Sequence, residues 1–519
     1  MTNDIFHPRH YAKKSPDALA YRMCATGEDV TFLQLETRAN QGAHLFRAAG
    51  LHVGDHIVIM MENRREFLEI CFAADRAGLY YTTVSTHLTF DEISYIIADC
   101  GARVVVTSDH FSETNRKLHE TPVPGARLFI VGEPTRGFES WSEAAQSQPR
   151  TPIPDEVQGL DMLYSSGTTG RPKGIKWPLT GEKPGGRTML IDLLTSLFGY
   201  DSDTRYLSPA PLYHAAPLRH TMVTIKMGGT AFIMTKFDAQ NALEIIEKEN
   251  ITHSQWVPTM FVRLLKLPRE LRESFNISSM KMAVHAAAPC PVSVKHQMIN
   301  WWGPIIHEYY AGTENNGFTS INTEEWLIHE GSVGTAKLGV LHICDEAGNE
   351  LQNGHEGEIF FENGHQFEYY NDPEKTEACT NEFGWTSLGD IGRKDAEGYL
   401  FLTDRKSFVI ISGGVNIYPQ ETENVLLGHP LVLDAAVIGV PNEDFGEEVK
   451  AVVQLVENHE RSPDLEAALI EYCRSQLSSI KCPRTIEFRK TLPRAATGKL
   501  YKRKLRDEYW TQSSSISGG

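Results

Sequence analysis

The sequence predicts a large α/β domain of layered sheets with helical covers, joined by a hinge to a small α+β domain. The chain has 519 residues, which is more than one ordinary hydrophobic core accommodates. Short apolar runs with strand character alternate with longer helical patterns over most of the chain, and this order is typical of α/β sheets. Near the C-terminus the pattern changes to that of a compact module of modest size.

Each predicted element follows from its hydrophobic period. Apolar runs rich in β-branched residues predict strands at 57–60, 104–106, 128–131 and 231–234, and later at 435–440 and 451–456. Helical spacing predicts helices at 67–77, 239–248, 419–427 and 465–477. The charged run Thr403–Ser407 is interpreted as the junction between domains. We therefore divide the chain into residues 1–404, a hinge at 405–407, a mobile domain at 408–510, and a small polar tail at 511–519 that we expect to be disordered.

Composition excludes several classes of function. The formal net charge of −17 argues against a nucleic-acid-binding surface, although a local loop can still bind an anionic nucleotide. No apolar run is long enough to span a bilayer, and the N-terminus lacks the basic and apolar regions of a signal peptide. The eight cysteines are scattered without CxxC pairing, which favours reduced thiols in the cytoplasm over a disulfide framework or a zinc site.

The densest chemical signal is the run Ser-Ser-Gly-Thr-Thr-Gly-Arg-Pro-Lys-Gly at 165–174, which follows an apolar stretch with strand character. Glycines let backbone N–H groups approach an anion closely, hydroxyl groups add donors, and Lys173 adds a positive charge. A polyphosphate is the natural ligand of such a loop. The spacing differs from a Walker A loop, because Pro172 precedes the lysine and a glycine follows it. An ordinary polar surface loop is the alternative interpretation.

Five further motifs carry weaker signals when each is taken alone. The small residues Ala286–Pro289 offer a surface for a flat base, although such residues more often mark close packing. In the run Tyr309–Glu314 an aromatic ring can stack on adenine and a glutamate can hold Mg²⁺, whereas a buried strand end is the alternative. Asp390 suits two ribose hydroxyls, although a lone Gly-Asp is usually a turn. Arg405 and Lys499 would each be an ordinary surface charge if found alone.

Together these motifs resemble, in their order along the chain, the signatures of the adenylate-forming enzymes, which include acyl-CoA synthetases, peptide-synthetase adenylation domains and luciferases. The resemblance extends from about Tyr21 to Leu505. The segments 207–214, 369–376 and 412–419 are most similar to the acyl-CoA synthetase branch. The resemblance implies an enzyme, an acid–thiol ligase that joins an acid to AMP and then to CoA, with ATP, Mg²⁺ and coenzyme A as cofactor and substrates.

The resemblance also implies a role for particular residues. The nucleotide would contact Ser165, Ser166, Gly167, Thr168, Thr169, Gly170, Lys173, Ala287, Ala288, Pro289, Tyr309, Tyr310, Ala311, Gly312, Thr313, Asp390 and Arg405. Catalysis would depend on Lys499, Thr313 and Glu314, with Mg²⁺ held by Glu314 and Thr168. Ser407 would be the hinge residue, and Ser412, Gly413 and Gly414 would line the CoA channel. The acyl pocket would draw on His214, Ala215, Trp256, Ala286, Ala311 and Gly312.

The substrate and the final acceptor are less clearly marked. No lysine or arginine is obvious among the acyl-pocket residues, so we expect a bulky apolar acid, which would be a medium or long fatty, aryl or polycyclic acid. Three alternatives remain: transfer of the acyl group to an acyl carrier protein, a luciferase-like oxygenase, and a binding protein on an inactive scaffold. The sequence leaves a homodimer open.

Four positions depart from the family pattern. Ala311 stands where glycine is often found, and Ser407 and Phe408 replace the usual hinge residues. Trp177 stands where many relatives have a polar residue, and we expect it to reshape the acyl pocket or its entrance.

Overall fold

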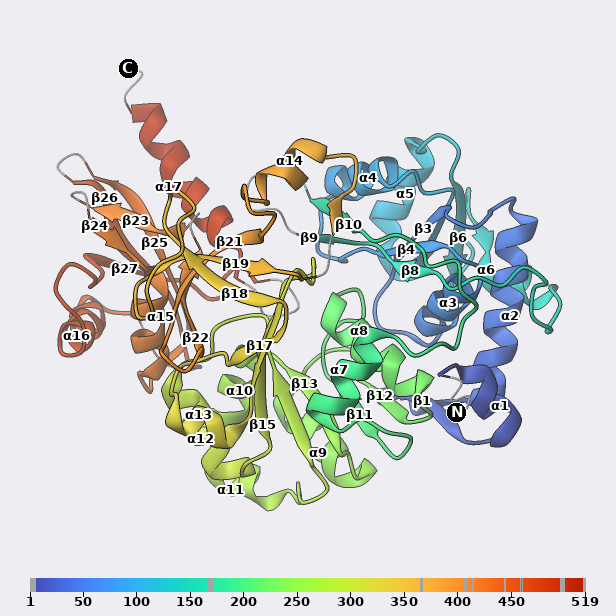
Figure 1. The fold of residues 1–519 in the computed structure, drawn as a ribbon, viewed down its shortest axis with the longest axis horizontal. Coiled ribbons are helices and arrows are strands. Elements are labelled where there is room, and N and C mark those ends of the chain that lie inside the picture. The colour runs from blue at the N-terminus through green and yellow to red at the C-terminus, as the bar shows by residue number, and fades with distance from the viewer. Residues whose placement is uncertain are drawn as a thin grey trace. The chain divides into compact units, whose positions relative to one another are not determined.

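The computed structural model describes residues 6–165, 172–364, 367–405, 408–412, 415–442, 445–457, 459, 461–494 and 500–516 (Figure 1). By packing, the chain divides into two compact units. Unit 1 comprises residues 1–255, 275–283 and 366–376, and unit 2 comprises 256–274, 284–365 and 377–519. This division does not coincide with the predicted boundary at 405–407, and that boundary stays a prediction.

Unit 1 contains a parallel six-stranded sheet with the strand order β7-β6-β5-β3-β4-β8. Its strands are β3 (His56–Met60), β4 (Tyr80–Thr83), β5 (Val104–Ser108), β6 (Arg127–Val131), β7 (Glu139–Ser140) and β8 (Leu160–Asp161). The helices of this region are α2 (Phe32–Ala48), α3 (Arg65–Arg76), α4 (Phe90–Asp99), α5 (Ser112–Glu120) and α6 (Trp141–Gln146), with a 3₁₀ turn at Asp109–Phe111. Figure 1 shows α4 and α5 on one side of the sheet and α3 on the other. Such helical covers on both faces explain why every residue of the central strands β3, β4 and β5 is buried.

A second group of strands in unit 1 runs in the order β13-β11-β12-β1-β2. It consists of β1 (Leu19–Met23), β2 (Glu28–Thr31), β11 (Arg205–Ser208), β12 (Thr230–Ile233) and β13 (His253–Trp256), and only β2 is antiparallel to its neighbour. The accompanying helices are α1 (Pro8–Lys14), α7 (Met189–Phe198), α8 (Ala215–Lys226) and α9 (Ala239–Glu249). Asp238 caps α9 by accepting a hydrogen bond from the Asn241 N–H, and the helix ends at Asn250 in the left-handed conformation.

The third sheet of unit 1 is small and antiparallel, and it combines segments that are distant in the sequence. Strands β9 (Leu163–Ser165) and β10 (Lys173–Lys176) flank the glycine-rich run, and β20 (Glu368–Tyr369) pairs with the other edge of β10. Helix α14 (Pro373–Ala378) begins four residues after β20. The glycine-rich run is therefore placed by strands on both of its sides.

Unit 2 contains three groups of mainly antiparallel strands. The first is β15 (Ile306–Tyr310), β16 (Phe318–Ile321) and β17 (Thr335–Leu338), and the second has the order β18-β19-β21-β22. The second group consists of β18 (Val340–Cys344), β19 (Gly357–Glu362), β21 (Thr386–Lys394) and β22 (Leu400–Arg405). The helices are α10 (Pro258–Leu265), α11 (Arg269–Ser274), α12 (Val292–Trp302) and α13 (Thr323–Ile328), and β14 (Met282–His285) lies at the unit boundary in the chain.

The C-terminal part of unit 2 is the predicted α+β module. Its sheet has the order β24-β23-β26-β25 with β27 beside β26, formed by β23 (Ile410–Ser412), β24 (Val415–Ile417), β25 (Val432–Asn442), β26 (Gly446–Leu455) and β27 (Thr485–Phe488). Its helices are α15 (Pro419–Gly428), α16 (Pro463–Arg474) and α17 (Lys502–Ile516). Helix α17 extends through residues 511–516, for which we expected disorder, because no glycine or proline interrupts the chain before Gly518. Among the described residues, none of the helices has both the length and the apolar character that a bilayer crossing requires.

Two buried histidines in unit 1 make stability depend on pH. Burial lowers the pKa of His220 to about 3 and that of His253 to about 4, and His253 contacts the Phe198 carbonyl at 3.0 Å. Because the folded pKa lies below the unfolded value of about 6.5, the unfolded chain takes up protons first as the pH falls. The stabilisation from neutral histidine is therefore present above about pH 6.5 and is lost as the pH falls toward the folded pKa.

We expect the melting temperature to fall between pH 6.5 and pH 5, and to fall less steeply in His253→Gln, which keeps a donor for the Phe198 carbonyl. Melting curves of both proteins across this range check the prediction. Parallel pH profiles of the wild type and the variant would contradict it.

Candidate active site

The predicted site residues fall in both units, and each group is described within its own unit. Ser166–Gly170, Ser407, Gly413, Gly414 and Lys499 lie outside the described residues. Ser165 ends β9, and Lys173 begins β10, where it pairs with Ser165 across the two strands. The two ends of the predicted phosphate loop are thus fixed opposite each other by strand pairing.

Tyr310 and Asp390 form the centre of the predicted nucleoside group in unit 2. Tyr310 is the last residue of β15 and Asp390 lies within β21, and the Tyr310 hydroxyl donates a hydrogen bond of 2.7 Å to Oδ2 of Asp390. Asp390 is buried, whereas Tyr310 is partly exposed. Asp390 also pairs in register with Arg405 at the end of β22, whose side chain is not among those described. The structure therefore links Tyr310 to Asp390, 80 residues later in the chain, by a side-chain hydrogen bond, and Asp390 to Arg405 by strand pairing.

The loop after β15 is tightly packed around Gly312. A Cβ atom at this position would lie 2.1 Å from Cδ1 of Leu388 and 2.9 Å from Oε2 of Glu314, so a larger residue does not fit without movement. The Asn315 N–H donates to the Gly312 carbonyl at 3.1 Å, and Asn315 itself has a φ of 54°. This turn buries Glu314, while Ala311 and Thr313 stay partly exposed beside it. Glu314 is a carboxylate on a fixed turn, and carboxylate oxygens are the ligands that Mg²⁺ prefers.

The small-residue loop leaves β14 with an unusual backbone. Ala287 has a φ of 74°, in the left-handed region that alanine rarely adopts, and it is exposed. Ala286 is buried, whereas Ala288 and Pro289 are partly exposed. Strained backbone of this kind is often found at ligand-binding sites. The nucleotide-binding role of this loop stays a prediction.

A buried ion pair lies on the elements that follow and support this loop. Lys295 of α12 contacts Glu308 of β15 at 2.6 Å, and Nε2 of His285 lies 3.5 Å from the same carboxylate oxygen. The side chains of Lys295 and His285 are 0% exposed. Burial raises the pKa of Glu308 against the opposing effect of Lys295, and burial together with Lys295 holds the pKa of His285 well below its usual range. Lys295 is therefore the cation that balances Glu308, two residues before Tyr310.

The predicted acyl-pocket residues lie in different surroundings. His214 immediately precedes α8 and is partly exposed, with its ring 4.5 Å from that of Tyr213, and Ala215 begins the helix. Trp256, in unit 2, is completely buried, and its ring centroid lies 5.5 Å from Trp302 and 6.1 Å from Phe261. Trp256 thus packs as a core residue, and its part in an acyl pocket stays a prediction.

Two residues near His214 were missed by the sequence analysis. The Asn63 side chain donates to the carbonyls of Ala210 and Met234 and accepts from the Leu212 N–H at 2.7 Å, so it fixes the segment before His214. Arg219, one turn into α8, pairs with Asp161 at 2.8 Å and lies 4.9 Å from the ring centre of Trp177. The sequence carries no signal for either pairing, because both depend on contacts between distant segments.

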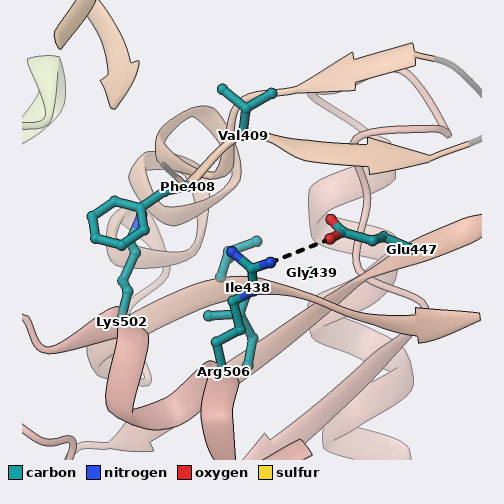
Figure 2. Close-up of a pocket in the computed structure, with 8 residues that line it drawn as sticks. Phe408, Val409, Ile438, Gly439, Glu447, Lys502 and Arg506 are labelled. Carbon is teal, nitrogen blue, oxygen red and sulfur yellow. Dashed lines mark ion pairs between the residues drawn. The ribbon is translucent and has the colours of Figure 1, made fainter. Parts of the chain in front are cut away.

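In the C-terminal module, the residues that follow the predicted hinge lie close to α17. Figure 2 shows a hollow lined by Phe408, Val409, Val437, Ile438, Gly439, Glu447, Lys502 and Arg506. Lys502 pairs with Glu423 at 2.9 Å and lies 5.6 Å from the ring centre of Phe408, and Arg506 is 3.7 Å from Glu447. Ser412 ends β23, is buried, and lies beside Val415 and Gly446 in register. The hollow lies between the residues that follow the predicted hinge and α17, and its charged lining residues are engaged in ion pairs.

Two family models match this chain. That of the AMP-binding enzymes matches residues 8–370, and that of the AMP-binding enzyme C-terminal domain matches residues 421–499. The long-chain-fatty-acid–CoA ligase FadD13 of Mycobacterium tuberculosis is 30% identical over 516 residues, covering 98% of this chain and 99% of the relative. Feruloyl-CoA synthase of an Amycolatopsis species is 31% identical over 511 residues, covering 97% and 98%. The structure of ATP-bound MatB from Rhodopseudomonas palustris is similar with a TM-score of 0.79 and 28% identity, covering 98% of this chain and 99% of that chain.

Proposed function

Because this chain belongs to the AMP-binding enzyme family, as an acid–thiol ligase of the acyl-CoA synthetase branch, we propose that it activates a bulky apolar carboxylic acid. The acid would be a medium or long fatty, aryl or polycyclic acid, first joined to AMP and then to CoA. The observation that carries the proposal is the hydrogen bond from Tyr310 to Asp390, which sets an aromatic face beside a buried carboxylate. This is the pairing that an adenosine needs, since its base stacks and its ribose donates two hydroxyl protons.

In the first half-reaction the substrate carboxylate attacks the α-phosphorus of ATP and pyrophosphate leaves. Lys173 and the glycine-rich run would hold the β- and γ-phosphates, and Lys499 would neutralise the charge that develops around the α-phosphate. Glu314 and Thr168 would hold Mg²⁺, which supplies additional positive charge at the phosphates. In the second half-reaction the thiol of CoA attacks the acyl carbonyl and AMP leaves, with Ser412, Gly413 and Gly414 beside the pantetheine chain and Ser407 as the pivot.

The apolar substrate is supported by the charges around His214. The cation nearest to it along α8 is Arg219, and its charge is balanced by Asp161 while its guanidinium group lies on Trp177. A second carboxylate on the substrate would have to compete with Asp161 for this arginine, which is costly for partly buried groups. The two relatives named above carry a long-chain fatty acid and a feruloyl group in their names, and neither acid has a second carboxyl group.

A panel of carboxylic acids tests the proposal. Short, medium and long fatty acids, aryl acids and polycyclic acids would each be incubated with ATP and Mg²⁺, with and without CoA, and the products quantified by mass spectrometry. We expect AMP, pyrophosphate and a CoA thioester with one apolar class. Pyrophosphate release without a thioester would overturn the CoA step and indicate an acyl carrier protein or another acceptor.

The role of Asp390 is checked by nucleotide binding in the absence of acid. Asp390→Ala removes the partner of the Tyr310 hydroxyl and the proposed ribose ligand. Because ATP and AMP share the ribose, we expect both dissociation constants to rise by about tenfold or more, as for other hydrogen bonds to charged groups. Calorimetric titration of each nucleotide measures the effect, with Asp395→Ala, a partly exposed carboxylate beyond β21, as the control. Unchanged affinity for both nucleotides would contradict the role.

A further inference from the structure

The segment 369–376, which the sequence marked as similar to acyl-CoA synthetases, has no part in the mechanism described so far. In the structure it lies against the end of the phosphate loop. The Nζ atom of Lys173 lies 5.1 Å from the centre of the Tyr369 ring, at a distance where the ammonium group is attracted to the π-electrons. Tyr369 is 7% exposed, so most of its ring is shielded from water, and shielding strengthens such an attraction.

Several contacts hold Tyr369 in this place. Tyr369 pairs in register with Ile175, and the Tyr370 N–H donates to the Gly174 carbonyl at 2.8 Å. The Tyr369 N–H donates to Oγ1 of Thr376 at 3.0 Å, which ties the strand to α14. The ring of Phe367 meets the Tyr369 ring edge-on at 5.3 Å. The aromatic face is thus fixed by backbone pairing on one side and by a helix on the other.

The same segment also fixes the strand that leads into the phosphate loop. The Asn371 side chain donates to the Asp99 carbonyl at 3.0 Å, with Asn371 in the left-handed conformation at a φ of 57°. The Tyr164 hydroxyl in β9 donates to Oδ2 of Asp99 at the end of α4. Residues 369–371 therefore support both strands that flank the loop. They contact β10 directly, and they are linked to β9 through Asp99.

We propose that Tyr369 is a positioning residue that orients the ammonium group of Lys173 toward the β- and γ-phosphates of ATP. Lysine has a flexible four-carbon side chain, and ordering it costs conformational entropy. A fixed aromatic face beneath the ammonium group restricts that side chain before the nucleotide binds, while the donors of the ammonium group remain directed to the phosphates. The inference rests on the proposed function, since it assumes that Lys173 binds the phosphates that ATP has and AMP lacks.

The test compares the affinities for ATP and AMP in the full-length protein without acid, so no substrate has to be known. Tyr369→Leu removes the ring, and Tyr369→Phe keeps it. We expect Tyr369→Leu to weaken ATP binding about fivefold, the size of a typical cation–π contact, while AMP binding stays the same. Tyr369→Phe is expected to retain the wild-type ratio of the two affinities, and calorimetric titration gives both values.

A matched control lies next to Tyr369 in the chain. Tyr370 also contacts a lysine, since Nζ of Lys176 lies 4.5 Å from its ring centre, but this lysine also contacts the Tyr80 ring and His56 and is not among the residues proposed to bind phosphate. Tyr370→Leu therefore removes a ring of similar size from the same segment. Its ratio of ATP to AMP affinity is expected to stay at the wild-type value.

A double variant separates positioning from general damage. In Lys173→Met the ring has no cation to orient, so adding Tyr369→Leu is expected to weaken ATP binding no further. Equal weakening of ATP and AMP binding by Tyr369→Leu, or a further loss of ATP affinity in the Lys173→Met background, would overturn the inference. If Tyr369→Leu does not fold, the affinities for ATP and AMP are compared in Thr376→Val instead. This substitution removes the acceptor of the Tyr369 N–H at similar side-chain volume.

A failure of the proposed function would give a different pattern of affinities from a failure of the positioning role. If Lys173→Met alone leaves the ratio of ATP to AMP affinity unchanged, then Lys173 does not bind the distal phosphates and the proposed mechanism is wrong at this step. If Lys173→Met lowers the ratio and Tyr369→Leu does not, only the positioning role is wrong.

Discussion

Replacing Lys499 by alanine is expected to lower the rate of acyl-adenylate formation about 10²–10³-fold, as removal of a single charge-stabilising donor does in other active sites. The same variant should convert a supplied acyl-adenylate to the thioester at nearly the wild-type rate, because the lysine would act only in the first half-reaction. Pyrophosphate release and thioester formation, measured separately with the acid that the panel identifies, give the two rates.

The control for this variant is Lys504→Ala, which removes an exposed lysine of α17 only five positions further along the chain. It should leave both half-reactions unchanged. Equal loss of both half-reactions in Lys499→Ala would show that the lysine does not act in the adenylation step alone, and its proposed restriction to the first half-reaction would have to be abandoned.

Replacing Lys295 by methionine is expected to destabilise unit 2 by about 3–5 kcal/mol, because it leaves the carboxylate of Glu308 buried without its counter-charge. The neighbouring His285 is a poor substitute, since its complete burial, the largest cause of its lowered pKa, remains in the variant and opposes its protonation. Chemical denaturation followed by fluorescence measures the loss. The destabilisation should become smaller as the pH falls, because protonation of Glu308 removes the uncompensated charge.

The double variant Lys295→Met/Glu308→Gln is the control for the ion pair. It removes both charges and should recover most of the lost stability. If the double variant were as unstable as Lys295→Met, loss of the cation–π contact between Nζ and the Trp326 ring, whose centre is 4.7 Å away, would be the cause instead of the pairing with Glu308.

The regular elements could be predicted from the sequence because each carries its own hydrophobic period. The predicted strands at 57–60 and 128–131 correspond to β3 and β6, and the predicted helix at 239–248 corresponds to α9. The resemblance to the adenylate-forming enzymes is confirmed by the two family models, and so are the enzyme class and the fold class. Motifs of chemically specific residues in a fixed order were sufficient for these conclusions.

Contacts between distant segments could not be predicted. Strand β20 has two residues, too few for any period, and it pairs with a strand almost two hundred positions earlier. Lys295 and Glu308 are each unremarkable as single charged residues, and only the fold places both in the interior. The domain limits and the roles of Gly413, Gly414 and Lys499 stay predictions, the last three because they lie outside the described residues.

The position of β20 in the chain also determines when unit 1 can be completed during synthesis. The ribosome releases β9 and β10 long before residues 366–376, and until then the outer edge of β10 has no partner. A nascent chain that ends near residue 360 would therefore expose an unpaired strand edge, a surface prone to wrong pairing. Unit 1 is completed only when its last segment in the sequence, residues 366–376, has been made, so chains that stall or end before it would bind ATP poorly even if their other strands had formed.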